Sequence, residues 1–241
     1  MEMTSAWRAA RLLFLSLACA VIAGCSGSSG ETSAPAETAS SPPAAAPESS
    51  SSHSTRPRVV CLGDSLTAGL GLSSTDQAYP ALLEHRLKRA GFDYEVINAG
   101  VSGDTSAGGL RRLDWSLQGD VRVLIVALGA NDGLRGLPPS ELRSNLEAIV
   151  AAAQKRNVRV LVLGMEAPPN FGAVYIKEFR AVYTQVAADL DVPLVPFFLE
   201  GVAGVGRLNQ ADGIHPTAEG QQRIADTIWR SLEPLVRART S

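Results

Sequence analysis

The sequence is poor in the residues on which disulfide frameworks, metal sites and nucleic-acid-binding surfaces depend. Its 241 residues contain three cysteines and three histidines, and its formal net charge is -2. Without an excess of positive charge, the chain has no electrostatic field that would attract nucleic acid. Cys19 and Cys25 lie near the N-terminus, so Cys61 alone is left for a folded domain. This excludes an internal disulfide and a cysteine-based zinc site in that domain, and Cys61 is predicted to be a small buried hydrophobe.

The sequence also lacks an apolar run long enough to span a bilayer at its N-terminus. Residues 12–24 are apolar, but a spanning helix takes roughly 20 residues. The run follows two arginines, as in a secretory signal peptide, and ends in Ala-Gly-Cys at Cys25. This ending resembles a bacterial lipobox, whose cysteine is lipidated and becomes the first mature residue. Ordinary cleavage after a small residue is the alternative.

We therefore predict a lipoprotein-type signal peptide over residues 1–25, with Cys25 as the lipidation site. Residues 26–57 are almost entirely Ser, Ala, Pro, Thr, Glu and Gly, and they show no apolar periodicity. Such a segment cannot bury enough apolar surface to offset the entropy lost on ordering. It is predicted to be a disordered tether, a plain linker being the simpler alternative, that joins the anchor to a domain over residues 58–241. The predicted location is the bacterial cell envelope, with the domain in the periplasm or outside the cell.

From residue 58 onward, apolar segments alternate with amphipathic helical patterns. The middle apolar segments are nearly continuous, which is typical of strands covered on both faces of a sheet. The alternation predicts an α/β fold, a three-layer α/β/α sandwich around a parallel sheet. The predicted strands lie near residues 58–62, 94–98, 121–127, 158–163 and 192–196, and the predicted helices cover about 79–90, 140–155, 174–189 and 217–236.

The scarcity of histidine limits the choice of a catalytic base. His53 lies in the predicted tether, and His85 lies among charged residues on the polar face of a predicted helix. His215 precedes the last helix, with Asp212 three residues before it. A histidine base needs an acceptor at Nδ1 so that Nε2 faces the nucleophile, and Asp-x-x-His can supply one within a turn. This short motif also arises by chance, and Asp212 or Thr217 could instead cap the helix.

A candidate nucleophile stands in VVCLGDSLTAG, residues 59–69, where an apolar strand runs into a turn that contains Ser65. Chemistry often sits in such turns, but a serine or aspartate there can also be a plain helix cap. The stretch alone favours the capping interpretation. Asp64 is predicted to hold the turn as a hydrogen-bond acceptor rather than to act as a catalytic acid.

Two further turns after apolar strands carry donors that acyl-transfer chemistry can use. Gly103 can present a backbone N–H without an obstructing side chain, and Asn131 offers a side-chain amide. A flexible turn and an Asx turn are the simpler alternatives. If the sheet order is 2-1-3-4-5, the turns that bear Ser65, Gly103 and Asn131 meet at one edge. Asp212 and His215, which follow the fifth strand, can reach the same edge.

Four blocks of the sequence, taken in order, resemble those of the GDSL or SGNH hydrolase superfamily. The resemblance covers about residues 58–236, and the long second and third blocks are similar to the branch of periplasmic thioesterases, lysophospholipases and arylesterases. One departure is Ala130, where many members have glycine. The blocks are GDSLTAG (63–69), INAGVSGDTSAGGLRRL (97–113), LGANDGLRG (128–136) and DGIHPTAEGQ (212–221).

The resemblance implies a five-stranded parallel sheet of flavodoxin-like order 2-1-3-4-5, the SGNH hydrolase fold. It implies that Ser65 is the nucleophile, His215 the base and Asp212 its partner. The oxyanion hole would be formed by the backbone N–H groups of Ser65 and Gly103 and by the Asn131 side chain. No metal or organic cofactor is implied, and the expected partners are a small acyl ester or thioester and, through the lipid anchor, a membrane.

The implied activity is hydrolysis of carboxylic esters or thioesters through an acyl-enzyme, of the arylesterase, acyl-CoA thioesterase or lysophospholipase type. A carbohydrate O-deacetylase on the same fold and a non-catalytic surface lipoprotein are the alternatives. An acyl groove could lie within residues 104–118 and 165–178, although the same side chains could pack between helices and sheet. The candidate lining residues are Leu110, Trp115, Pro168, Pro169, Phe171 and Tyr175.

Overall fold

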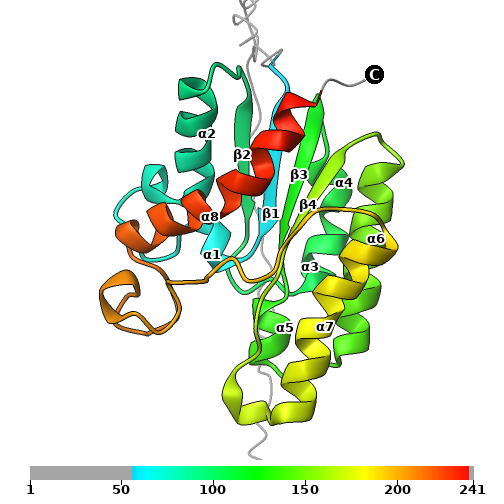
Figure 1. Ribbon diagram of the computed structural model, residues 1–241, viewed down its shortest axis with the longest axis vertical. Coiled ribbons are helices and arrows are strands. Elements are labelled where there is room, and N and C mark those ends of the chain that lie inside the picture. Colours follow the sequence, from blue (N-terminus) through cyan, green and yellow to red (C-terminus); the bar gives the residue numbers. More distant parts are fainter. Residues whose placement is uncertain (1–55, 239–241) are drawn as a thin grey trace, which may run out of the picture. The chain divides into compact units, whose positions relative to one another are not determined.

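A parallel sheet forms the centre of the protein in a computed structural model, which describes residues 56–238 (Figure 1). The predicted signal peptide, Cys25 and nearly all of the predicted tether lie outside these residues, and the domain boundaries stay predictions. The strands follow the order β2-β1-β3-β4-β5, and all paired strands are parallel, which confirms the predicted sheet. They are β1 (Arg58–Gly63), β2 (Glu95–Gly100), β3 (Val121–Ala127), β4 (Arg159–Leu163) and β5 (Leu194–Val195).

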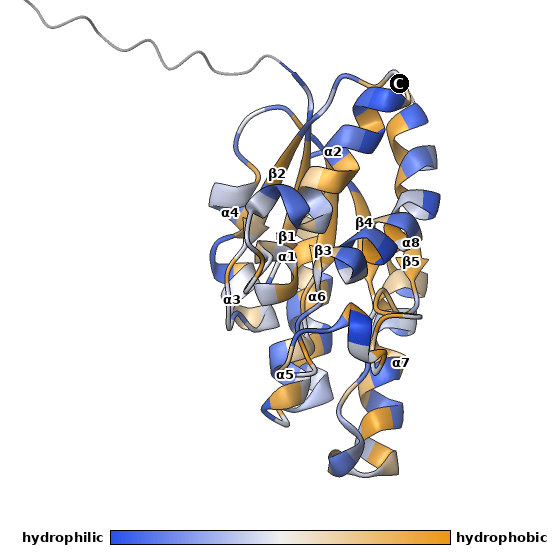
Figure 2. Ribbon diagram, turned by 90° about the vertical axis from the view of Figure 1, so that its left-hand side faces the viewer, coloured by the Kyte–Doolittle hydropathy of each residue, from blue (hydrophilic) through white to orange (hydrophobic). Residues whose placement is uncertain are grey.

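The register of the three neighbouring strands makes them end at a common level. Gly63, the last residue of β1, pairs with Gly100 of β2 and with Ala127 of β3. β1 and β3 are rich in β-branched and apolar residues, and nearly every residue in them is buried, because helices cover both faces. Figure 2 shows mainly hydrophobic strands at the centre of the fold. The turns after the three strands therefore emerge side by side at one edge of the sheet.

Helices form a layer on each face of the sheet, which confirms the predicted sandwich. α2 and α8 pack together on one face, while α6 packs against α3 and α7 on the other (Figure 1). Short 3-10 turns cover Thr75–Gln77, Pro169–Phe171 and Gly206–Leu208. The helices are α1 (Ser65–Ala68), α2 (Tyr79–Arg89), α3 (Ser106–Arg111), α4 (Leu113–Ser116), α5 (Ala130–Leu134), α6 (Pro139–Gln154), α7 (Ala173–Asp189) and α8 (Ala218–Arg237).

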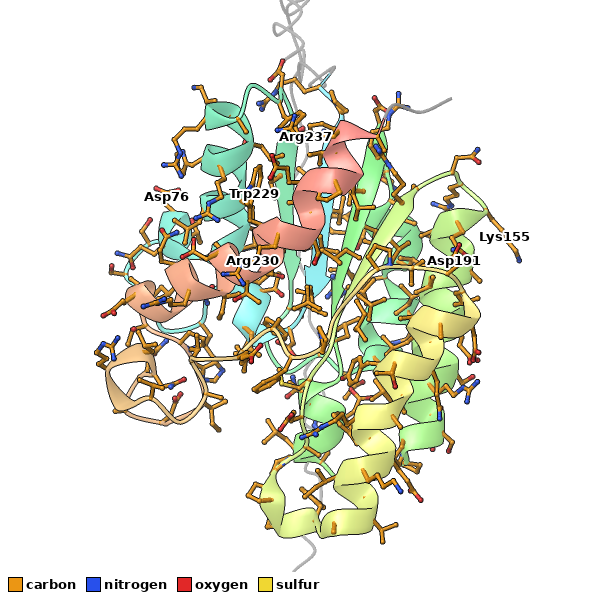
Figure 3. All side chains as sticks on the ribbon, in the orientation of Figure 1. Asp76, Lys155, Asp191, Trp229, Arg230 and Arg237 are labelled. Atoms are coloured by element: carbon orange, nitrogen blue, oxygen red, sulfur yellow. The ribbon has the colours of Figure 1, made fainter. Side chains whose placement is uncertain are left out.

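The long helices follow the predicted apolar periodicity. In α2, Tyr79, Leu83 and Leu87 lie one turn apart and are fully buried. Trp229 of α8, labelled in Figure 3, lies beneath the guanidinium of Arg86 from α2, which is 5.9 Å from the ring centroid. A cation–π contact thus joins these two helices. Among the helices of residues 56–238, none has the length and apolarity required to cross a bilayer.

The short elements depart from the sequence-based prediction. α1, α3, α4 and α5 are too short for a helical period to be recognised in the sequence. β5 is predicted over 192–196 but contains two residues, since Pro193 and Pro196 flank it and supply no N–H group to a sheet ladder. Cys61 is buried in β1 as predicted, and burial raises the pKa of its thiol.

Candidate active site

Ser65 stands at the start of a one-turn helix directly after β1. Asp64 is the N-cap of α1, and its Oδ1 accepts a hydrogen bond from the Leu66 N–H at 3.0 Å. The preceding Gly63 has no room for a side chain, because a Cβ there would lie 2.0 Å from Thr67 Oγ1. Asp64 is therefore the cap, and the hydroxyl of Ser65 is left for another partner.

That partner is His215, which links Ser65 to Asp212. The Nε2 atom of His215 lies 2.9 Å from Ser65 Oγ, and its Nδ1 atom lies 2.6 Å from Asp212 Oδ2. Asp212 Oδ1 accepts the backbone N–H groups of Ile214 and His215 at 2.9 and 3.0 Å. The carboxylate thus orders the turn and orients the ring. Thr217, rather than Asp212, caps α8 through a hydrogen bond from the Gly220 N–H.

Asp212 is ionised at neutral pH. Hydrogen bonds from the side chain of His215, and then from the backbone of His215 and Ile214, lower the pKa of Asp212 to about 2. A carboxylate at this distance accepts the proton on Nδ1 of the neutral ring. Nε2 is then the unprotonated nitrogen and accepts the hydrogen bond from Ser65 Oγ.

Two glutamines hold the histidine turn against the serine turn, and the sequence reasoning missed both. Gln210 Nε2 donates to the carbonyls of Leu70 and Pro216 at 2.8 and 3.0 Å, and its backbone N–H donates to the His215 carbonyl at 2.7 Å. Gln221, buried in α8, donates to the Leu66 carbonyl at 3.1 Å. A polar residue on the buried face of an amphipathic helix was the available signal for Gln221.

Asn131 also points towards the serine turn. It lies in α5, directly after β3, and its Nδ2 atom lies 3.4 Å from Asp64 Oδ2. Asp64 itself is only 1% exposed. Burial raises the pKa of Asp64 to about 6, although hydrogen bonds from the Leu66 N–H and the Asn131 side chain oppose the shift.

Gly103 lies on the exposed turn after β2. Its φ of +83° is a left-handed conformation that favours glycine. Its carbonyl accepts a hydrogen bond from Arg135 Nη2, at the end of α5, at 2.8 Å. The Val101 N–H donates to the Gly63 carbonyl at 3.0 Å, so this turn leaves the sheet beside the serine turn. The structure thus brings the predicted residues Ser65, Gly103 and Asn131 to one edge.

Asp132, the neighbour of Asn131, was also missed by the sequence reasoning. It is buried, and its carboxylate accepts the N–H and the hydroxyl of Ser106 at 2.8 and 2.5 Å. Asn145 of α6 donates to the same hydroxyl at 2.9 Å. This network ties α5, which carries Asn131, to α3, which follows the Gly103 turn. The available signal in the sequence was that Asp132, a charged residue, directly follows the candidate donor Asn131.

The acyl groove expected within residues 104–118 and 165–178 stays a prediction. Trp115 lies in α4, which leads into the amino-terminal end of β3, and its side chain is exposed. Phe171 and Tyr175 contact each other with ring centroids 5.3 Å apart. Large apolar side chains are exposed on the segments that follow β1 to β4 and on the histidine turn, and these are Leu70, Val101, Leu134, Phe171 and Ile214.

Within the described residues, no group of three or more His, Cys, Asp or Glu side chains is arranged to hold a metal ion. The expectation that the reaction uses no cofactor stays a prediction. His85 is exposed on α2, on its predicted polar face, and His53 lies outside the described residues.

Residues 61–223 match the GDSL-like lipase/acylhydrolase family, so this chain belongs to that family. It is 49% identical over 179 residues to the esterase TesA of Pseudomonas aeruginosa, which covers 74% of this chain and 89% of the relative. It is 41% identical over 179 residues to thioesterase 1/protease 1/lysophospholipase L1 of Escherichia coli, with 74% and 84% covered. An arylesterase of Vibrio mimicus is 38% identical over 176 residues, with 73% and 88% covered.

Solved structures agree with the fold. The crystal structure of TesA matches with a TM-score of 0.71 and 48% identity, covering 75% of this chain and 99% of that one. The psychrotrophic esterase EstA from Pseudoalteromonas matches with a TM-score of 0.70 and 36% identity, covering 75% and 99%. The predicted superfamily and fold are thereby confirmed.

Because the carboxyl of Asp64 is buried, we expect the free energy of unfolding to fall as the pH rises from about 4 to 6. The folded state raises the pKa of Asp64 from 3.8 to about 6, so the folded protein keeps this proton after the unfolded chain has lost it. Relative to Asp64→Asn, the wild type should lose up to about 3 kcal/mol of unfolding free energy across this interval. Urea denaturation of both proteins at pH 4 and pH 7 measures the difference, and a constant difference would contradict the prediction.

Proposed function

We propose that this protein is a serine esterase that hydrolyses carboxylic acyl esters or thioesters through an acyl-enzyme. The observation that carries the proposal is the hydrogen-bonded chain from Ser65 Oγ through His215 to Asp212, with distances of 2.9 and 2.6 Å. These three side chains lie at the carboxyl end of the sheet, and the protein belongs to an acylhydrolase family. Relatives named esterase, thioesterase, lysophospholipase and arylesterase support the same class of ester substrate.

In the first step, the Oγ atom of Ser65 forms a bond to the acyl carbon while Nε2 of His215 takes the hydroxyl proton. The carbonyl electron pair moves onto its oxygen and gives a tetrahedral oxyanion. Asp212, ionised and hydrogen-bonded to Nδ1, stabilises the imidazolium that forms. The carboxylate keeps its charge throughout, so the proton on Nδ1 stays on the ring.

The oxyanion would be stabilised by donors from the three neighbouring turns. The N–H of Ser65 lies in the first turn of α1, where backbone N–H groups have no acceptor within the helix. The N–H of Gly103 and the side-chain amide of Asn131 complete the proposed set. A single donor of this kind typically lowers the barrier by about 3–4 kcal/mol.

Acylation is completed when the tetrahedral intermediate collapses and His215 gives its proton to the leaving oxygen or sulfur. The acyl group is then bonded to Ser65 Oγ. Water attacks the acyl carbon, gives a proton to Nε2 of His215 and releases the carboxylic acid, and the proton returns to the serine. The cycle thus restores the starting state of the enzyme.

An apolar acyl chain or aryl group is the moiety that the rim of the site favours. The segments that follow β1 to β4 and the histidine turn carry apolar side chains that are each at least about a third exposed, namely Leu70, Val101, Leu134, Phe171 and Ile214. Burial of an acyl chain against such side chains gains roughly 0.8 kcal/mol for each methylene removed from water. Esters of medium or long acyl chains are therefore the proposed substrates.

The proposed lipid anchor places this activity at a membrane of the bacterial cell envelope. The support is the Ala-Gly-Cys sequence at Cys25, after a short apolar run and before residues 26–57. Metabolic labelling with an alkyne fatty acid should modify the full-length protein in a bacterial host and fail to modify the Cys25→Ser variant. Equal labelling of both proteins would contradict this part of the proposal.

Loss of either the nucleophile or the base should abolish the reaction without unfolding the protein. We expect Ser65→Ala and His215→Ala each to lower kcat/KM for p-nitrophenyl esters by about a thousandfold or more. Asp212→Ala should have an equal or smaller effect, because only the orientation of the base is lost. Melting curves check that the variants fold, and a folded variant with wild-type activity would refute the assignment.

The acyl-chain preference should rise with length from acetyl to medium chains. Because each added methylene can be buried against the apolar rim, kcat/KM should increase along a series of p-nitrophenyl esters until the rim is covered. Parallel series of acyl-CoA thioesters and lysophospholipids identify the leaving group that is accepted. Activity confined to acetyl esters would instead favour a carbohydrate O-deacetylase.

A further inference from the structure

The side chain of Arg112 joins the two turns that carry the proposed backbone donors. Arg112 lies between α3 and α4, and its Nη2 atom donates to the Gly63 carbonyl at 2.7 Å. Its Nη1 atom donates to the Ala99 carbonyl, also at 2.7 Å, and its Nε atom to Asp104 Oδ2 at 2.6 Å. One planar group thus binds three acceptors from β1, from β2 and from the turn after β2.

These three acceptors stand next to the residues of the proposed reaction. Gly63 lies two residues before Ser65, and Asp104 directly follows Gly103. Ala99 pairs in register with the residue that precedes Gly63, at the carboxyl end of the sheet. Arg112 therefore fixes the serine turn and the Gly103 turn with respect to each other.

The ion pair between Arg112 and Asp104 is largely buried and is not a surface ion pair. The side chains of Arg112 and Asp104 are each 18% exposed. Gly108 of α3 leaves space for Asp104, because a Cβ at that position would lie 2.3 Å from Asp104 Oδ1. A charge-assisted network of this kind is hard to deform, since moving either turn breaks a short hydrogen bond to the guanidinium.

We infer that Arg112 is a positioning residue that sets the separation of the Ser65 and Gly103 N–H groups in the oxyanion hole. This inference rests on the proposed function and adds a residue to its machinery. The guanidinium of Arg112 donates to the carbonyls of Gly63 and Ala99 and to Asp104, and none of these is a reacting group of the proposed mechanism. It acts through the two strand-end carbonyls and through Asp104.

The inference makes a specific kinetic prediction, because the negative oxygen develops only in the transition state. Displaced donors weaken binding of the tetrahedral intermediate and leave binding of the neutral ester unchanged. Loss of Arg112 should therefore lower kcat while KM stays within about threefold. Lysine cannot replace arginine here, since its ammonium group lacks the planar fork that reaches three acceptors.

Arg58 provides a matched control on the same two strands. Its Nε atom donates to Glu95 Oε2 at 2.9 Å, and the two side chains are 21% and 24% exposed. Arg58 and Glu95 pair at the amino-terminal ends of β1 and β2, the opposite edge of the sheet from Ser65. Substitution of Arg58 breaks a similar ion pair between the same strands without touching the turns of the site.

The experiment compares Arg112→Lys and Arg112→Met with Arg58→Lys and Arg58→Met. We expect the Arg112 variants to lower kcat for a p-nitrophenyl ester about 10- to 100-fold and to weaken inhibition by an alkyl boronic acid, a tetrahedral adduct former, by a similar factor. The Arg58 variants should keep kcat within about twofold. Asp104→Asn, which keeps the arginine, should lower kcat in the same direction by a smaller factor, and it serves if the Arg112 variants fail to fold.

Backbone hydrogen exchange gives a readout that does not depend on activity. Residues 63–66 and 100–104 should exchange faster in folded Arg112 variants, or in Asp104→Asn, and should be unchanged in the Arg58 variants. Unchanged kcat and exchange in these site variants would overturn the inference, as would equal loss of kcat on substitution of Arg58. An effect confined to KM would also overturn it. Failure of the proposed function is recognised separately, since Ser65→Ala would then leave ester hydrolysis at the wild-type level.

Discussion

The site depends on the register of β1, β2 and β3, which makes the three strands end side by side. Parallel pairing sets Gly63 beside Gly100 and Ala127, and each strand then runs into a turn that carries one group of the site. A shift of β1 by one residue would move Ser65 by about 3.3 Å and turn the strand's side chains to the opposite faces. The 2.9 Å contact between Ser65 Oγ and His215 could not survive such a shift.

Buried polar groups maintain this alignment beyond the ends of the ladder. Asp64 and Asp132 are almost fully buried. The carboxylate of Asp64 joins α1 to α5, and that of Asp132 joins α5 to α3. Within residues 56–238, every buried side-chain nitrogen and oxygen has a partner. Because an unpartnered buried polar group costs several kcal/mol, these networks favour one arrangement of the turns over its alternatives. The same networks place a carboxyl of raised pKa, that of Asp64, next to the proposed nucleophile.

The sequence predicted the sheet, its order and the long helices, because apolar runs and helical periodicity depend on local pattern. It also identified the groups that meet around Ser65, since the single usable histidine and the three turns follow one another in a recognisable order. It missed Arg112, Gln210 and Gln221, each of which also binds a carbonyl at least 49 residues away, a contact that leaves no local pattern. The role of Trp115 stayed open, because an apolar side chain after the second strand gives the same sequence pattern whether it lies near the site or near the other end of the sheet. β5 was predicted too long because its apolar run continues past the prolines that end the pairing.

Activation of Ser65 as a nucleophile by His215 can be tested by locating the adduct of a fluorophosphonate on the folded wild-type protein with peptide mass spectrometry. We expect a single covalent adduct on Ser65, formed rapidly in the wild type and slowed by orders of magnitude in His215→Ala. An adduct on another residue, or equally rapid labelling of Ser65 without the histidine, would contradict it.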